Sequence, residues 1–182
     1  MRMREWKRMV ARALGLGSLL LLVPSTGCAG SIHGQVLDAQ SGQPIAGAVV
    51  LGVWTKVAGL PGLTHTELVG VKEVETDAQG RFTLERPRTL FPFAEDDESI
   101  TVYKFGYIAW NNIFTFPPTG SGRRKDQRVP AEIRLEKFPD GQSHQRHISF
   151  INLARGGLYG LDRIPRFWDA LQPEMRMARE KR

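Results

Sequence analysis

The sequence predicts a mainly β protein, a seven-stranded antiparallel β-sandwich followed by a short helical C-terminal tail. The 182 residues include 19 Gly and 11 Pro spread along the chain, which favours short elements joined by turns over a helical bundle. A hydrophobic fraction of 41% and a charged fraction of 24% are typical of a folded domain. Short apolar segments follow one another between turn signals, as they do in sandwiches.

The first 27 residues have the layout of an export signal. Five basic residues and one acid lie in the first twelve positions, and the apolar run ALGLGSLLLLV follows at 13–23. That run is too short to span a bilayer, which needs about 20 apolar residues. We therefore predict a signal peptide over 1–27; a short N-terminal anchor or a buried helix is the alternative.

Cys28 is the only cysteine, so an exported chain has no internal disulfide partner for it. The stretch Ser25-Thr26-Gly27-Cys28 resembles the lipobox of bacterial lipoproteins. The resemblance implies that residues 28–30 form a lipidated N-terminus, with diacylglycerol on the sulfur of Cys28 and an acyl chain on its amine. Ala29 is not the Asp that retains such proteins at the inner membrane, which implies an outer-membrane address facing the periplasm. The alternative is a plainly secreted protein with a free thiol.

Seven segments of the mature chain have strand patterns. They are 32–36, 48–54, 71–76, 81–85, 99–104, 108–116 and 131–138. The run AVVLGVW at 48–54 is almost continuously apolar, which predicts a strand covered on both faces, with Gly52 allowing close approach. Between 71–76 and 81–85 we predict a hairpin turn, in which Asp77 accepts backbone hydrogen bonds and Gly80 has a positive φ.

Four ordered pieces of sequence share a family pattern: GQVLD at 34–38, GQPIAGAVV at 42–50, TDAQGRF at 76–82 and Gly106-Tyr107. Over residues 31–138 the chain resembles the carboxypeptidase regulatory-like domain, which has a transthyretin-like, Ig-like sandwich fold. The resemblance implies the fold and says almost nothing about function. The connections 55–70 and 117–130 are longer than the family core needs, and long loops on a sandwich are common binding elements.

No catalytic or metal site is predicted, and no cofactor. Enzymes of transthyretin-like fold use a two-Tyr, two-His iron site or a terminal Tyr-Arg-Gly-Ser, and neither is present. A Gly-x-Ser-x-Gly nucleophile elbow is also missing. His144 and His147 would share one face of a helix, but 143–150 looks extended, so we predict surface histidines. Residues 95–98 are predicted to form a solvated acidic loop.

Aromatic side chains crowd the segment 103–116, and not all of them fit inside one small sandwich. Trp110 stands beside two amides, as in sites where an exposed ring stacks on a sugar. Core packing is the first expectation for these aromatics. The alternative is a carbohydrate site, for which Tyr107, Trp110, Asn111 and Asn112 are the candidate residues.

The extension 139–182 is basic and partly helical. Ile164, Phe167, Trp168, Leu171, Met175 and Ala178 recur at spacings of three and four, which predicts one apolar helical face. We predict Asp162 as its N-cap and a kink or two short helices at Pro173. A candidate membrane or partner surface consists of Arg166, Phe167, Trp168, Arg176 and Arg179; packing of Phe167 and Trp168 on the sandwich is the alternative. Deletion of 162–182 is expected to leave the sandwich folded.

The function we expect is a non-catalytic binding or structural module of the cell envelope. Its partners would be the membrane, through lipidated Cys28, and an envelope protein. A nucleic-acid partner is not predicted, because four units of the net charge of +6 lie in the signal. The alternatives are a carbohydrate or peptidoglycan binder using the Trp110 region, and an accessory domain of an envelope hydrolase.

Overall fold

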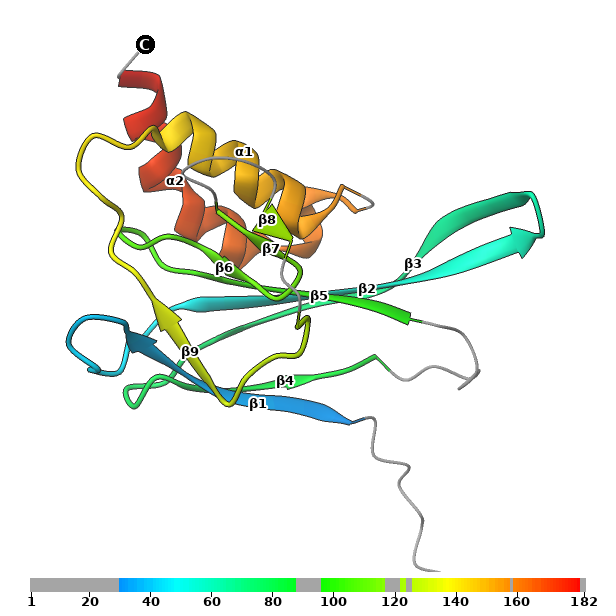
Figure 1. The fold of residues 1–182 in the computed structure, drawn as a ribbon, viewed down its shortest axis with the longest axis horizontal. Coiled ribbons are helices and arrows are strands. Elements are labelled where there is room, and N and C mark those ends of the chain that lie inside the picture. The colour runs from blue at the N-terminus through cyan, green and yellow to red at the C-terminus, as the bar shows by residue number, and fades with distance from the viewer. Residues whose placement is uncertain (1–29, 88–95, 117–121, 124–125, 158, 181–182) are drawn as a thin grey trace, which may run out of the picture.

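The computed structural model describes residues 30–87, 96–116, 122–123, 126–157 and 159–180. These residues form a mainly β protein with two α-helices near the C-terminus (Figure 1). The strands are β1 (Ser31–Asp38), β2 (Val49–Leu60), β3 (Leu63–Glu75), β4 (Arg81–Glu85), β5 (Asp96–Tyr103), β6 (Trp110–Asn111), β7 (Phe114–Thr115), β8 (Gly122–Arg123) and β9 (Glu132–Leu135). The helices are α1 (His144–Arg155), the 3₁₀ helix η2 (Leu161–Arg163) and α2 (Pro165–Glu180).

Two sheets face each other as a sandwich. One has the order β4-β1-β9, the other has the order β3-β2-β5-β6, and β7 and β8 form a separate two-stranded ribbon. The prediction of a wholly antiparallel sandwich is wrong at one pair, because β9 runs parallel to β1 with Val36 opposite Ile133. A long crossover brings β9 back beside β1, and such connections permit parallel pairing.

The first half of β2, residues 49–54, is buried on both faces, as its continuous apolar sequence predicts. Val50 and Trp54 face the other sheet, and Val49, Leu51 and Val53 face the helices. The inter-sheet core comprises Ile32, Val36, Ile45, Ala48, Val50, Trp54, Phe82, Leu84, Ile100, Val102, Trp110, Ile133 and Leu135. The helix-side core comprises Val49, Leu51, Val53, Tyr103, Ala109, Phe150, Ile151, Ala154, Ile164, Phe167 and Leu171.

The helices form a third layer on the outer face of the four-stranded sheet (Figure 1). The prediction of an extended segment at 143–150 is wrong, because α1 begins at His144. Ser143 caps this helix by accepting a hydrogen bond from the Arg146 amide at 3.3 Å. The helix buries Phe150, Ile151 and Ala154 against the sheet, and this tertiary packing outweighs its low amphipathicity.

The helix α2 runs without a break through Pro173, so of the two predicted outcomes, a kink or two short helices, the second is wrong. Buried residues on both sides of Pro173, such as Leu171 and Ala178, hold the whole helix in place. Its N-terminus is not capped by Asp162. Instead, the carboxylate of Glu73 on β3 accepts hydrogen bonds from the amides of Arg166 and Phe167 at 2.9 and 3.0 Å.

The turn predicted between β3 and β4 is confirmed, but the predicted hairpin is wrong, because β3 pairs with β2 in one sheet and β4 pairs with β1 in the other. Gly80 has φ 71°, and Asp77 accepts hydrogen bonds from the amides of Gln79 and Arg81 at 2.9 and 2.8 Å. The segment 55–70 is not a loop, because β2 and β3 continue as one hairpin that protrudes from the sandwich (Figure 1). We call its free part, residues 57–66, the arm.

Candidate functional site

The residues of the candidate carbohydrate site around Trp110 do not form an exposed surface. Trp110 is 9% exposed and belongs to the inter-sheet core, and the side chains of Asn111 and Asn112 are buried. Residues 108–116 do not form the predicted long strand, since β6 ends at Asn111. A buried indole offers no face for stacking on a sugar, so the core-packing expectation holds for Trp110.

The two asparagines are occupied by the backbone around β5. Asn112 Oδ1 accepts from the Ile100 amide, and its Nδ2 donates to the Glu98 and Gln127 carbonyls, all within 2.9 Å. Asn111 Oδ1 accepts from the amides of Ile113 and Phe114 at 2.8 Å. These amides therefore hold a bend after β6 in place, which is a structural role.

Tyr107 is half-buried and donates its hydroxyl to Asp38 Oδ2 at 3.0 Å. The Asp38 carboxylate also accepts from the Ser41 and Gln40 amides. The hydrogen bond from Ser41 is the largest cause that lowers the pKa of Asp38 to about 2, against the opposing effect of burial. Tyr107 therefore ties the 104–107 bend to the turn after β1.

Most polar groups of the helix-side core meet at Glu174 on α2. Its Oε1 lies 2.6 Å from His147 Nδ1 and 3.0 Å from His144 Nδ1, and its Oε2 accepts from the Tyr103 hydroxyl at 2.7 Å. Glu174 is 2% exposed and His147 is fully buried. The predicted surface location is therefore wrong for His147: α1 places the two histidines, which are three positions apart, on one face of the helix toward α2.

The hydrogen bonds around His147 fix its tautomer. The Ala109 amide donates to Nε2 at 2.8 Å, so this nitrogen carries no proton. The proton of the neutral ring is then on Nδ1 and is donated to the Glu174 carboxylate. Burial tends to raise the pKa of Glu174, but the hydrogen bonds from His147, His144 and Tyr103 outweigh it and hold this pKa below its usual value.

His144 differs from His147 because one of its nitrogens is open. Its Nδ1 faces Glu174, while no partner of Nε2 is found in the described part of the chain. Since no buried side-chain nitrogen or oxygen there lacks a partner, Nε2 is accessible to water. Phe138 stacks on the ring at 4.6 Å between centroids and fixes its plane.

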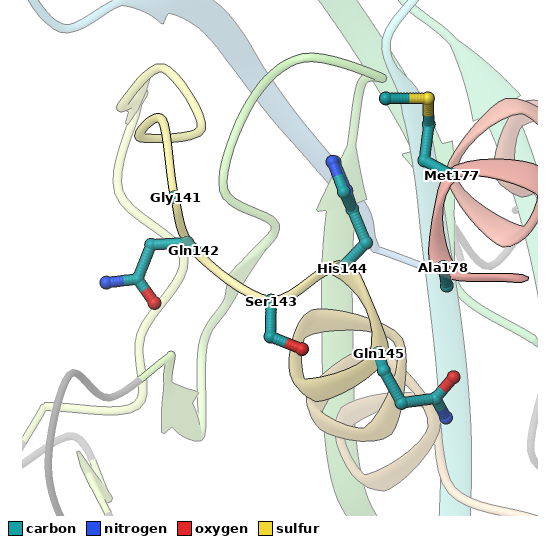
Figure 2. A pocket seen from close by; sticks show the side chains of 7 residues that line it. All are labelled: Gly141, Gln142, Ser143, His144, Gln145, Met177 and Ala178. Carbon is teal, nitrogen blue, oxygen red and sulfur yellow. The ribbon is translucent and has the colours of Figure 1, made fainter. Parts of the chain in front are cut away.

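A small hollow of about 260 Å³ adjoins His144 at the start of α1. It is lined by Gly141, Gln142, Ser143, His144, Gln145, Met177 and Ala178. Figure 2 shows the side chains of His144 and Met177 rising on the same side, from α1 and α2 respectively. The Ser143 hydroxyl is already used as the helix cap, so this hollow pairs an open imidazole with no activated nucleophile among its lining residues.

The predicted surface on the tail is divided by the packing of α2. Phe167 is fully buried in the helix-side core and Trp168 is half-buried, whereas Arg166, Arg176 and Arg179 are exposed. Phe167 is therefore excluded from any membrane or partner surface, because the sheet already covers it. The charged part of the prediction remains available to solvent.

The arm carries Leu60 and Leu63, the two most exposed of the large hydrophobic side chains in the described residues. Val57, Leu60 and Leu63 are 58%, 72% and 78% exposed. The sequence signal was the run VAGLPGLT at 57–64, which has a Pro-Gly turn between two leucines and no charge. It was interpreted as a long binding loop, and its hairpin structure was missed.

The remaining predictions concern the N-terminal anchor, metal binding and the membrane. Cys28 and residues 88–95 lie outside the described residues. Within the described ranges, no group of three or more His, Cys, Asp or Glu could hold a metal ion, and no helix is long and apolar enough to cross a membrane. No family model, curated protein or solved structure matches this chain.

Proposed function

We propose that this chain is an exported, lipid-anchored and non-catalytic module of the cell envelope that binds a partner protein. The lipobox-like sequence before Cys28 supports the anchor and an outer-membrane location facing the periplasm. The four family segments and the facing sheets of three and four strands support a seven-stranded, transthyretin-like domain of the carboxypeptidase regulatory-like type.

The observation that carries protein binding is the free edge of β3. This strand has 13 residues and, among the described residues, pairs only with β2. The other sheet edges are much shorter, with two residues in β6, five in β4 and four in β9. A long unpaired edge presents a row of backbone donors and acceptors to which another chain can add a strand.

The polar groups of the helix-side core support a role without catalysis. Both nitrogens of His147 and both oxygens of Glu174 are used in hydrogen bonds that join α1, α2 and the sheet. These contacts hold the third layer on β2 and β5. The partner would thus meet a rigid edge at residues 69–75.

Photocrosslinking tests the protein contact. A benzoylphenylalanine at Lys72 or Glu75, both exposed on β3, should capture one envelope protein in intact cells. The same group at Leu153, exposed on α1, is the matched control. Equal capture from β3 and from Leu153, or none from β3, would contradict the proposal. If the captured protein is a cell-wall hydrolase, the chain acts as its accessory domain.

The anchor has its own test. Metabolic labelling with palmitate should mark the wild-type protein and leave the Cys28→Ser variant unlabelled. The variant should also move from the detergent-requiring membrane fraction to the soluble fraction. An unlabelled wild-type protein that salt washes from membranes would contradict the lipid anchor without affecting the β3 contact.

A further inference from the structure

The arm protrudes well beyond the rest of the four-stranded sheet. The pairing of β2 with β5 ends at Lys56 and Asp96, so among the described residues the arm pairs only within itself. Four residues separate Lys56 from Leu60, and at about 3.3 Å per residue the tip stands about 13 Å beyond the sheet. In Figure 1 the hairpin extends from one end of the molecule without a neighbouring element.

The tip of the arm is apolar because of its register and its turn. Leu60 pairs with Leu63, so their side chains lie on the same face of the hairpin, on either side of Pro61-Gly62. Gly62 has φ 87°, which a turn of two residues with Pro first requires. Both leucines are more than two-thirds exposed, which is unusual for adjacent large aliphatic side chains.

The ionisable side chains nearest the tip lie at the base of the arm. Lys56 and Glu67 form an ion pair at 3.2 Å, and His65 lies 3.0 Å from the same carboxylate. Residues 57–64 contain no ionisable side chain. The arm thus has an uncharged apolar end and a polar base, the division expected of an element that enters the boundary between lipid acyl chains and water.

The chain enters the sandwich at the same end from which the arm leaves. The Gly30 carbonyl accepts from the Arg86 amide at 3.1 Å, the Arg86 side chain binds Glu98, and Glu98 accepts from Trp54 Nε1 at 2.8 Å. Two side chains, Arg86 and Glu98, therefore link Gly30 to Trp54, which precedes the arm's base by two residues. Cys28 is two residues before Gly30 in the sequence, within about 7 Å of it when extended.

We propose that the tip of the arm inserts into the membrane that carries the lipid anchor, with Leu60 and Leu63 among the acyl chains. This inference rests on the proposed anchor at Cys28. The tip lies about 20 Å beyond Trp54, whereas two residues of chain allow Cys28 to be at most about 7 Å from Gly30. Insertion to the depth of about 5–10 Å that interfacial elements reach takes up most of this difference, and a tilt of the sandwich takes up the rest.

Attachment to the membrane through both the lipid anchor and the tip of the arm fixes the orientation of the domain. An anchor alone leaves the domain free to rotate above the membrane, whereas anchor and tip together fix which face points away from it. Tethering also makes a weak apolar contact effective, because the tip is held at high local concentration near the lipid. The helix layer and the edge at residues 69–75 then have a set orientation.

The test replaces the lipid with a tether, so that it does not depend on acylation. Residues 28–182 with Cys28→Ser, preceded by an oligohistidine tag, are bound to vesicles of phosphatidylethanolamine, phosphatidylglycerol and a nickel-chelating lipid. Because Cys28 is the only cysteine, Leu60→Cys in this chain gives a single site for the polarity-sensitive dye NBD. Its emission should rise severalfold, shift to the blue and be quenched by nitroxide groups on the acyl chains.

Two controls make the result specific. The dye at Leu153→Cys, an exposed leucine on α1, should keep its aqueous emission on the same vesicles. With the dye at position 60, Leu63→Asp should abolish the response while leaving the melting temperature unchanged. Replacing phosphatidylglycerol by phosphatidylcholine should have little effect, because the tip is uncharged.

An unchanged aqueous emission at position 60 on tethered vesicles would overturn the proposal. A response at position 60 only when an envelope protein extract is added would also overturn it and assign the arm to a protein partner. Failure of palmitate labelling, in contrast, would remove the anchor at Cys28 and leave the measured insertion of the tip standing.

Discussion

The two cores on either side of the four-stranded sheet are built differently. The inter-sheet core draws alternate residues from short neighbouring strands, such as Phe82 and Leu84 of β4. The helix-side core joins β2 to helices about a hundred residues later, through Leu51 and Phe167 for example. The alternation of apolar and polar residues within a strand predicts the inter-sheet core. The helix-side core is indicated only by the run at 48–54, in which apolar residues occupy both faces of the strand.

Polar groups also separate the two cores. The buried polar side chains beside the inter-sheet core bond to its backbone: Thr76 accepts from the Ala48 amide and donates to the Ile45 carbonyl, and Asn112 accepts from the Ile100 amide. On the helix side, Tyr103, His147 and Glu174 form a buried hydrogen-bonded network, with His144 at its margin. Such a network costs desolvation but is directional, so we infer that it sets the position of the helices on a sheet face that is otherwise uniformly aliphatic.

Removal of the helix layer is the harshest test of this comparison and should have the largest effect. Truncation after Gln142 deletes Phe150, Ile151, Ile164, Phe167 and Leu171, each worth about 1.5–3 kcal/mol of burial. Their sum approaches the whole stability of a domain, about 5–15 kcal/mol. We therefore expect the truncated chain to aggregate or to lose its cooperative melting transition by circular dichroism.

This expectation reverses the one drawn from the sequence, in which deletion of 162–182 leaves the sandwich folded. Deleting 162–182 alone still exposes Leu51 and Val53 by removing α2. A soluble truncated chain with a cooperative transition near that of the full chain would show that the sandwich is stable without its third layer.

Matched leucine substitutions compare the two cores directly. Leu51 and Leu84 are both fully buried, Leu51 in the helix-side core and Leu84 in the inter-sheet core. Leu51→Ala and Leu84→Ala should each lower the free energy of unfolding by about 2–5 kcal/mol, measured by denaturant titration. A much smaller loss for Leu51→Ala would mean that the helices pack loosely and relax around the cavity.

Glu174→Gln tests the polar network with a change of one atom. The amide keeps an acceptor for the histidines but loses the charge, so we expect a loss of about 1.5–3 kcal/mol at neutral pH. The folded-state pKa of Glu174 lies below its ordinary value of 4.5, so its ionised form stabilises the fold above that pH. The difference in stability between wild type and variant should shrink as pH falls below about 4.5.

At each pH, the free energy of unfolding of the variant is subtracted from that of the wild type. Other acids, including Asp38, contribute equally to both chains, so the difference reports on Glu174. A difference that stayed constant from neutral pH to pH 3 would show that the carboxylate charge does not stabilise the network.

Features that depend on neighbouring residues, such as turns, could be predicted from the sequence. Contacts between residues far apart in the chain could not. Asp77 and Gly80 are a turn within five residues, and their roles follow from backbone chemistry alone. The cap that Glu73 gives to α2 joins residues more than ninety positions apart, and nothing in either sequence segment indicates it. Trp110 and Asn112 failed as a candidate site for a related reason. The same residue types that line sugar sites also fill cores and hold bends, and only packing distinguishes these roles.

Substitutions on the two faces of α2 should give the smallest changes in stability, and these changes should differ between the faces. Arg176 is exposed on the outer face, so Arg176→Ala should change stability by less than about 0.5 kcal/mol. Arg179 lies in the last turn, where a cation interacts with the helix dipole, so Arg179→Ala should cost about 0.3–1 kcal/mol. Raising the salt concentration should screen the effect at Arg179 and leave that of Arg176 unchanged. Ala178 lies between them in sequence but is buried, and Ala178→Arg should cost more than both because a charged side chain would replace a methyl group that is only 7% exposed. Equal losses at all three positions in thermal melts would show that α2 has no distinct inner face.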